Sequence, residues 1–536
     1  MSGIVTAKTT ARVERTSILG RLEALAPILL VLIIVLWVAV VFAASAYKYE
    51  TFGQGYDQVD FEQAIWNTTQ GRIMEDSRFN FTGSVFGMDW MPMLFFFVPV
   101  YALIPSAHVL FFLQIVGSAL GAVPLYWLAR DRLRSKLAGV GAGVLYLLYP
   151  TLLHTALNPF QVRLFAVTLL LFAFYYFEKG NWHLFAAFAL LAMLARTDVS
   201  LVVGLFGVYA LLTRRGWPYI VGPLVVGFGY FALSTFVIVP SYAYPGAFSH
   251  SIASVGSNSM DCWPCGTNPI IAYYGHLGSS GPEILGYIVT HPFEVVGLMF
   301  SGPKIVYMLS LLLPLAFLPF LAPKPLVLAL PILFLNLLSL RSSQFDYETH
   351  YSLLMIPGLL ASTIYGADRL RNMVERSWFR RGEVPDTIRW AQIGALVMSL
   401  WALVLIEPYK NPIYKNPVAR AFLFPEPASR IKAAHELIAM IGPEAKVAAS
   451  SKLAPQLLPR RYIYNFPPAP YSPYNFGSRT RADYVKLDYI LVDSNASALD
   501  ETANKIDGKS GLEVLRTLPE WKQVAEAEGL LLFKRQ

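Results

Sequence analysis

The sequence predicts a polytopic α-helical membrane protein with a small α/β domain near its C-terminal end. Hydrophobic residues make up 55% of the 536 residues and charged residues only 15%, with a mean hydropathy of +0.47. Soluble domains normally contain roughly a quarter charged residues. Apolar runs of about 20 residues also recur along the chain, and this is the length that crosses a bilayer core as a helix.

The first segments set the predicted orientation. Residues 1–24 are polar and basic, with Lys8, Arg12, Arg15 and Arg21, so we expect them to stay in the cytoplasm. Leu25–Tyr47 is the first span and runs outward. It lacks a small-residue cleavage site, which predicts an anchor that is retained. The loop of residues 48–90 is then extracytoplasmic. Met91–Ile104 is apolar but short for a crossing and is interrupted by prolines, which predicts a re-entrant or interfacial helix.

The transmembrane domain, residues 25–406, continues with apolar segments that alternate in direction. These segments are Ala107–Leu128, Leu137–Leu157, Leu164–Phe177, Leu184–Ala195, Val199–Leu212, Tyr219–Pro240, Ile305–Leu321, Leu326–Leu340, Leu353–Ala367 and Ile393–Ile406. A second long outer loop covers residues 241–292. The total is about 11 transmembrane helices. Nearly every Lys/Arg cluster then falls on the cytoplasmic side, which explains the net charge of +8 without nucleic-acid binding, since no nucleic-acid fold surrounds these clusters.

Residues 407–536 have the composition of a soluble domain. A proline-rich connector leads to a helical pattern at Ala428–Ile441, and a second helical pattern covers Ala496–Thr517. Short β-like runs accompany them at Lys446–Ala449, Tyr462–Phe466, Tyr489–Val492 and Leu530–Phe533. Alternating strands and helices predict a small α/β domain. The number of spans places it on the extracytoplasmic side.

Four polar clusters share the predicted outer face. They are Asp57 with Asp60 and Glu62; Asn158 with Gln161 and Arg163; Arg196 with Asp198; and Arg341 with Asp346, Glu348 and His350. Ionisable groups at the ends of spans are costly unless they are paired or used. Solvated loop charges are the alternative for each of them. Their convergence on one face favours a functional site.

A helix over Asp57–Asn67 would place Asp60, Gln63 and Asn67 on one polar arc. Glu62 would lie on the apolar side, where a carboxylate is hard to ionise or tightly paired. Asp57 begins the segment and either caps the helix or faces a cleft.

Glycosyl transfer is a chemistry that such a face can support. A carboxylate accepts the proton of the acceptor hydroxyl, and arginine stabilises the departing phosphate through paired hydrogen bonds. Asp57 with Arg196, Arg341 or His350 provides this set, although His350 alternatively caps or bonds a helix end.

Cys262 and Cys265 form a C-x-x-C pattern in the second outer loop. The spacing resembles a thiol–disulfide active site, but the strand-then-helix context of such sites is missing. A local disulfide formed in an oxidising compartment is the favoured interpretation. Two cysteines alone do not make a zinc site.

The stretch Tyr56–Thr68 with Gly71-Arg72 resembles the opening motif of a family of prokaryotic membrane proteins of unknown function, grouped by similarity with the GT-C glycosyltransferases. The other segments that resemble this family are Pro92–Gln114, Arg196-Thr197-Asp198, His350-Tyr351, Tyr462–Pro467 and Ala482–Val485. Two positions depart from its pattern: Asp89 stands where a histidine is expected, and Asn158-Pro159-Phe160-Gln161 replaces an Asp-Phe-His-like turn. A role of these histidines in binding a metal or a phosphate therefore does not carry over to this chain.

The resemblance implies a GT-C architecture in which an acidic residue of the first outer loop acts as base, and Asp57 occupies that position. It implies a polyprenyl-phosphate sugar as donor in the bilayer, with a glycan or protein as acceptor. The candidate substrate- and phosphate-binding residues are Asp60, Glu62, Gln63, Arg196, Asp198, Arg341, His350 and Tyr351. No metal ligand is assigned, and a divalent metal cofactor stays open. The alternative functions are a transporter or flippase, although the spans carry almost no charge, and a non-enzymatic anchor that displays the C-terminal domain.

Overall fold

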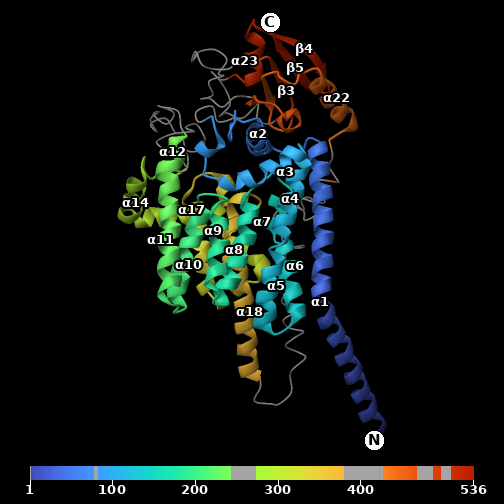
Figure 1. Cartoon of the computed structure of the whole chain (residues 1–536), viewed down its shortest axis with the longest axis vertical. Coiled ribbons are helices and arrows are strands. Elements are labelled where there is room, and N and C mark those ends of the chain that lie inside the picture. Colours follow the sequence, from blue (N-terminus) through green and yellow to red (C-terminus); the bar gives the residue numbers. More distant parts are fainter. Residues whose placement is uncertain are drawn as a thin grey trace.

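The computed structural model describes residues 2–77, 83–242, 273–378, 422, 426–466, 487–496 and 509–536. Two predicted features, the span Ile393–Ile406 and the pair Cys262/Cys265, lie outside these residues. Most of the described chain is helical. The helices form an elongated bundle, and a small sheet lies at one end of it (Figure 1). We call the described residues from 426 to 536 the C-terminal unit.

The first half of the bundle contains a long N-terminal helix followed by shorter ones. These helices are α1 (Ser2–Glu50), α2 (Asp57–Thr69), α3 (Val98–Leu103), α4 (Ala107–Ala119), α5 (Ala122–Leu133), α6 (Lys136–Leu147), α7 (Pro150–Ala156), α8 (Arg163–Glu178), α9 (Trp182–Met193) and α10 (Val199–Leu212). The second half contains α11 (Trp217–Leu233), α12 (Val239–Ser241), α14 (Gly281–Thr290), α15 (Pro292–Met299), α16 (Gly302–Leu312), α17 (Leu330–Leu338) and α18 (Ile356–Trp378). Short 3-10 turns connect many of them, and a π-helical turn, Ser234–Ile238, joins α11 to α12.

Among the described residues, three helical segments are long and apolar enough to cross a membrane. They are Gly20–Glu50, Ala107–Leu133 and Trp217–Ser241, and the number rises to five if each of two bent helix pairs counts as one span. One of these pairs is α6 with α7, bent by 55°, within the predicted span Leu137–Leu157. The predicted total of about 11 spans therefore remains a prediction.

Close helix packing depends on glycine. A Cβ atom added at Gly227 of α11 would lie 2.4 Å from the backbone nitrogen of Gly204 in α10 and 2.6 Å from the carbonyl oxygen of Ser200. A Cβ atom at Gly207 would likewise lie 2.5 Å from the carbonyl oxygen of Ile220. Small residues let helix backbones approach in this way, which is typical of helices that associate in membranes. The glycines at positions 204, 207 and 227 therefore permit the close approach of α10 and α11.

The C-terminal unit contains a mixed sheet with two short helices. Its strands are β1 (Val447–Ser450), β2 (Ile463–Phe466), β3 (Tyr489–Asp493), β4 (Trp521–Ala527) and β5 (Leu530–Arg535), and its helices are α22 (Ala428–Ala439) and α23 (Gly511–Thr517). The strand order is β2-β1-β3-β5-β4. Strands β1, β2 and β3 are parallel, whereas β5 is antiparallel to β3 and β4. The small C-terminal α/β fold predicted from the sequence is therefore present.

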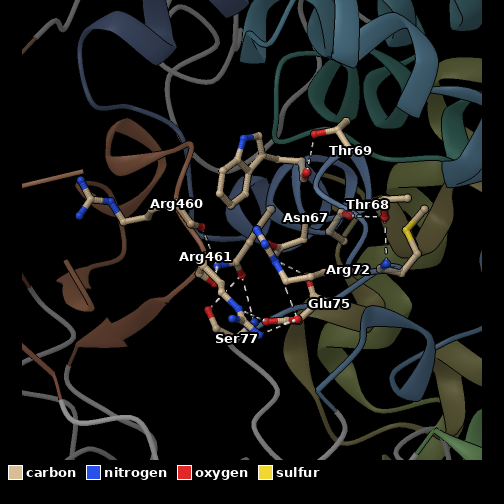
Figure 2. Close-up of polar contacts among 12 residues, drawn as sticks. Asn67, Thr68, Thr69, Arg72, Glu75, Ser77, Arg460 and Arg461 are labelled. Atoms are coloured by element: carbon tan, nitrogen blue, oxygen red, sulfur yellow. Dashed lines mark hydrogen bonds and ion pairs between the residues drawn. The ribbon is translucent and has the colours of Figure 1, made fainter. Parts of the chain in front are cut away.

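Helix α2 lies between the C-terminal unit and the bundle (Figure 1). Residues Phe52, Tyr56 and Val59 share one apolar cluster with α22 and the sheet. The hydroxyl of Tyr56 donates to the carbonyl oxygen of Ile463 at 2.8 Å. The segment after α2 adds an ion pair between Arg461 and Glu75, at 2.8 Å (Figure 2). The unit is thus docked on the segment that holds the predicted catalytic carboxylate.

Candidate functional site

The predicted helix around Asp57 is present as α2, and Asp57 is its first residue. The N-cap position is Tyr56, whose side chain makes no capping hydrogen bond. Asp57 is partly buried, and its charge interacts with that of Arg341. A carboxylate in the first helical turn is also stabilised by the helix dipole. Asp57 is therefore close enough to a cation from a distant part of the chain for their charges to interact.

Glu62 is 2% exposed on the inner side of α2. Its carboxylate accepts hydrogen bonds from the Gln58 amide at 2.7 Å and the Tyr101 hydroxyl at 2.8 Å. Burial raises the pKa of Glu62 to about 7, while these two hydrogen bonds lower it. The burial and the two hydrogen bonds agree with the expectation that Glu62 is hard to ionise or tightly paired, and its predicted substrate contact stays a prediction. Because Tyr101 belongs to α3, its hydrogen bond links α2 to the bundle.

Gln63 and Asp60 are buried on α2. The Gln63 amide donates to the carbonyl oxygens of Arg460 at 3.2 Å and Arg461 at 2.7 Å, and its oxygen accepts from the backbone and side chain of Ser77. The amide of Gln63 thus bonds the C-terminal unit, and its oxygen bonds Ser77 in the segment after α2. This geometry favours a structural role for Gln63, and its predicted substrate contact stays a prediction.

Arg196 and Asp89 form an ion pair beside the turn between α9 and α10. The Arg196 Nε donates to one Asp89 oxygen at 2.5 Å, and the other oxygen accepts from the backbone of Thr197 at 3.2 Å. The Asp89 side chain is only 4% exposed. Asp89, which replaces the histidine expected from the family pattern, therefore orients Arg196.

Arg163 is the first residue of α8, and its side chain is 5% exposed. It pairs with Asp198 at the start of α10, and its guanidinium lies over the Tyr351 ring, 5.2 Å from the centroid. Its Nε and Nη1 atoms are buried without a hydrogen-bond partner in the described residues, as is one oxygen of Asp198. Unsatisfied donors on a buried cation cost free energy, so this arginine is suited to an anionic ligand.

Arg341, His350 and Tyr351 lie beside these pairs. The Arg341 guanidinium donates to the Tyr273 hydroxyl at 2.8 Å and lies 5.8 Å from the centroid of the Tyr351 ring. Burial lowers the pKa of His350 well below its ordinary value, and the charges of Arg163, Arg196 and Arg341 lower it further. His350 is therefore neutral at pH 7 and can donate or accept a hydrogen bond.

The structure thus brings together residues from three of the four predicted polar clusters around His350 and Tyr351, and Asp57 of the fourth interacts with Arg341. Sequence reasoning left Arg163 and Asp89 off the list of candidate binding residues and did not consider Tyr273. Arg163 stands in a polar turn like any loop arginine, and only the absence of the expected histidine singled out Asp89. Within the described ranges, no three His, Cys, Asp or Glu side chains gather closely enough to hold a metal ion.

Comparison with known proteins gives a family. The model of a family described as "Predicted membrane protein (DUF2079)" matches residues 48–532. No curated protein matches the chain. Among solved structures, the chain is similar to crystal structures of ArnT from Cupriavidus metallidurans. The form bound to undecaprenyl phosphate has 14% identity and a TM-score of 0.46, and the apo form has 13% identity and a TM-score of 0.45. Both comparisons cover 93% of this chain and 97% of the other.

Proposed function

The chain belongs to the DUF2079 family of predicted membrane proteins, and we propose that it is a membrane glycosyltransferase. In this proposal it transfers a sugar from a polyprenyl-phosphate donor to a hydroxyl group of a glycan or protein acceptor. The reaction takes place at the end of the bundle that carries the C-terminal unit. The basic loops at the other end favour a cytoplasmic position for that end, so the reaction is extracytoplasmic.

The observation that carries the proposal is the arginine cluster, in which Arg163 is buried and Arg196 and Arg341 are partly buried. The positive charges of Arg163, Arg196 and Arg341 all lower the pKa of His350. Arg163 also keeps two buried N–H groups without partners among the described residues. A phosphate group offers acceptor oxygens and negative charge that match a guanidinium in paired geometry. Because Asp89 and Asp198 hold two of the arginines in place, the cluster is preorganised for a phosphate.

In this proposal, Asp57 acts as the general base. As the acceptor oxygen forms its bond to the anomeric carbon, the hydroxyl proton passes to the Asp57 carboxylate. The bond between the anomeric carbon and the phosphate oxygen breaks at the same time, and the electron pair leaves with the polyprenyl phosphate. The arginine charges stabilise the developing negative charge on that phosphate. Neutral His350 is available as a hydrogen-bond donor to it.

The test uses purified full-length protein in lipid vesicles with a panel of radiolabelled polyprenyl-phosphate sugars and acceptor extracts. We expect transfer by the wild type and a loss of at least about 100-fold for Asp57→Asn, which is the scale of a general base. The matched control is Glu50→Gln, which neutralises an exposed carboxylate at the end of α1. This variant should keep full activity.

A lipid-binding measurement distinguishes phosphate binding by Arg163 from proton transfer to Asp57. Arg163→Gln should weaken retention of the polyprenyl phosphate, whereas Asp57→Asn should retain it. Full transfer activity of the Asp57→Asn variant would remove the base role. Binding or translocation of the lipid without sugar transfer by the wild type would instead support a flippase, and the absence of both would support an anchor.

A further inference from the structure

A second polar region lies at the other end of the bundle. Helix α8 begins at Arg163 in the arginine cluster and ends at Glu178, so the two ends are about 22 Å apart at 1.5 Å per residue. Beside Glu178 the structure has a cavity of about 610 Å³. Its charged lining residues are Arg132, Glu178, Arg214, Arg215, Lys324 and Arg369. These come from the ends of α5 and α8, from the turn after α10, from the residues just before α17 and from the interior of α18. Helices α5 and α10 end in the lower part of the bundle in Figure 1.

Glu178 is the single acidic group of this lining, and it is already engaged. It pairs with Arg132 at 3.0 Å and accepts a hydrogen bond from the Tyr209 hydroxyl at 2.9 Å. Arg215 lies 4.0 Å from the same carboxylate and also donates to the backbone oxygen of Glu178 at 3.1 Å. One carboxylate therefore serves two arginines.

The other three cations of the cavity have no carboxylate within ion-pair distance in the part of the chain that the structure describes. Arg369 donates to the carbonyl oxygen of Leu321 at 3.1 Å, and among the described residues Arg214 and Lys324 form no ion pair. Five cations and one anion leave the lining with a strong excess of positive charge. Like charges held around one cavity repel each other, and an anion between them removes that repulsion.

Apolar side chains flank the lining segments in the chain. Leu211 and Leu212 precede the Thr213–Arg215 turn, and Trp217 follows it; Phe320 precedes the Ala322–Pro325 turn. Trp217 is 75% exposed and Leu211 is 62% exposed. An exposed tryptophan at a helix end is typical of the membrane–water interface, and the exposed leucine adds apolar surface beside it. The cations thus stand where a lipid headgroup would be, with apolar surface beside them for its acyl chains.

We propose that this cavity binds the phosphate headgroup of an anionic phospholipid from the adjoining leaflet. Basic pockets between membrane helices recognise such headgroups, and the charge excess, the volume and the apolar rim all suit one. The site does not depend on the glycosyltransferase proposal, because it lies at the opposite end of α8.

The test measures binding to full-length protein in an uncharged detergent at low salt, where surface charges are least screened. Short-chain phosphatidylglycerol, short-chain phosphatidylcholine and inorganic phosphate are titrated separately. We expect phosphatidylglycerol to bind at least about 10-fold more tightly than phosphatidylcholine. Equal affinity for the two lipids would overturn the proposal, as would inorganic phosphate binding as tightly as phosphatidylglycerol, which would indicate a soluble ligand.

The variants locate the site. The double variant Arg214→Gln/Lys324→Gln should weaken phosphatidylglycerol binding by about 10- to 30-fold. The matched control is Arg134→Gln/Lys136→Gln, which removes the same charges from exposed residues outside the cavity. Arg134 and Arg214 share a left-handed backbone with φ of 56°, so backbone strain is matched as well. Equal losses in both double variants would refute the location, and the wild-type lipid preference remains decisive if a variant fails to fold.

Discussion

Replacing Glu62 with glutamine should remove a pH dependence from the stability of the protein. Burial raises the pKa of Glu62 from 4.5 to about 7. Between these values the folded state keeps the proton that the unfolded state loses. The stabilisation from neutral Glu62 is therefore fully present below pH 4.5 and is lost as the pH rises through about 7.

The size of the effect follows from the shift. One pKa unit corresponds to 1.36 kcal/mol, so a rise from 4.5 to about 7 corresponds to about 3 kcal/mol of unfolding free energy. Glutamine keeps both contacts, because its oxygen can accept from Gln58 and its amide can donate to the Tyr101 oxygen. The Glu62→Gln variant should therefore be close to the wild type at pH 5 and more stable at pH 8.

The assay is thermal unfolding of the purified protein in detergent at pH 5 and pH 8, followed by tryptophan fluorescence. The wild type should lose more stability between the two values than Glu62→Gln, by most of the 3 kcal/mol. Glu444→Gln, at an exposed position of the C-terminal unit, should keep the wild-type pH dependence. If Glu62→Gln and the wild type lose the same stability between pH 5 and pH 8, the inference that Glu62 is a neutral carboxyl group in the folded protein is refuted.

Two further predictions concern packing. Gln63→Ala removes two hydrogen bonds between α2 and the C-terminal unit and should destabilise this contact by about 1–3 kcal/mol. Hydrogen exchange of α2 and β2 should rise, whereas Gln70→Ala, at an exposed position, should leave it unchanged. Gly227→Ala forces α10 and α11 apart and should lower the melting temperature, at a cost of about 1–3 kcal/mol. Gly229→Ala has nothing within 4 Å of the added atom and should be neutral or stabilising by up to about 1 kcal/mol; equal effects of the two would contradict the packing argument.

Local pattern was sufficient for much of the C-terminal sheet. Strands β1, β2, β3 and β5 coincide with the predicted apolar runs. Their side chains are mainly buried, so their residues are mostly apolar and can be recognised in the sequence. Strand β4, Trp521–Ala527, was missed because it is an edge strand whose side chains are mostly exposed. Its sequence carries no apolar run, and its position follows from pairing with β5.

The bundle shows a similar division. Hydropathy located the apolar segments, since each reflects the composition of consecutive residues. It did not predict the 55° bend between α6 and α7, which depends on how the two helices pack against their neighbours. Pro150, the first residue of α7, was visible in the sequence, but a proline at that position is compatible with either a kink or a helix start.

The sequence alone determined the membrane character, the helical segments, the small α/β unit and the carboxylate-rich start of α2, because these depend on composition and short periodic patterns. The partners of the charged side chains were decided only by the tertiary structure. Arg196 meets Asp89 across 107 residues, and Arg163 meets Asp198 across 35. Such pairs form because folding brings helix ends together, and no local pattern records which ends will meet.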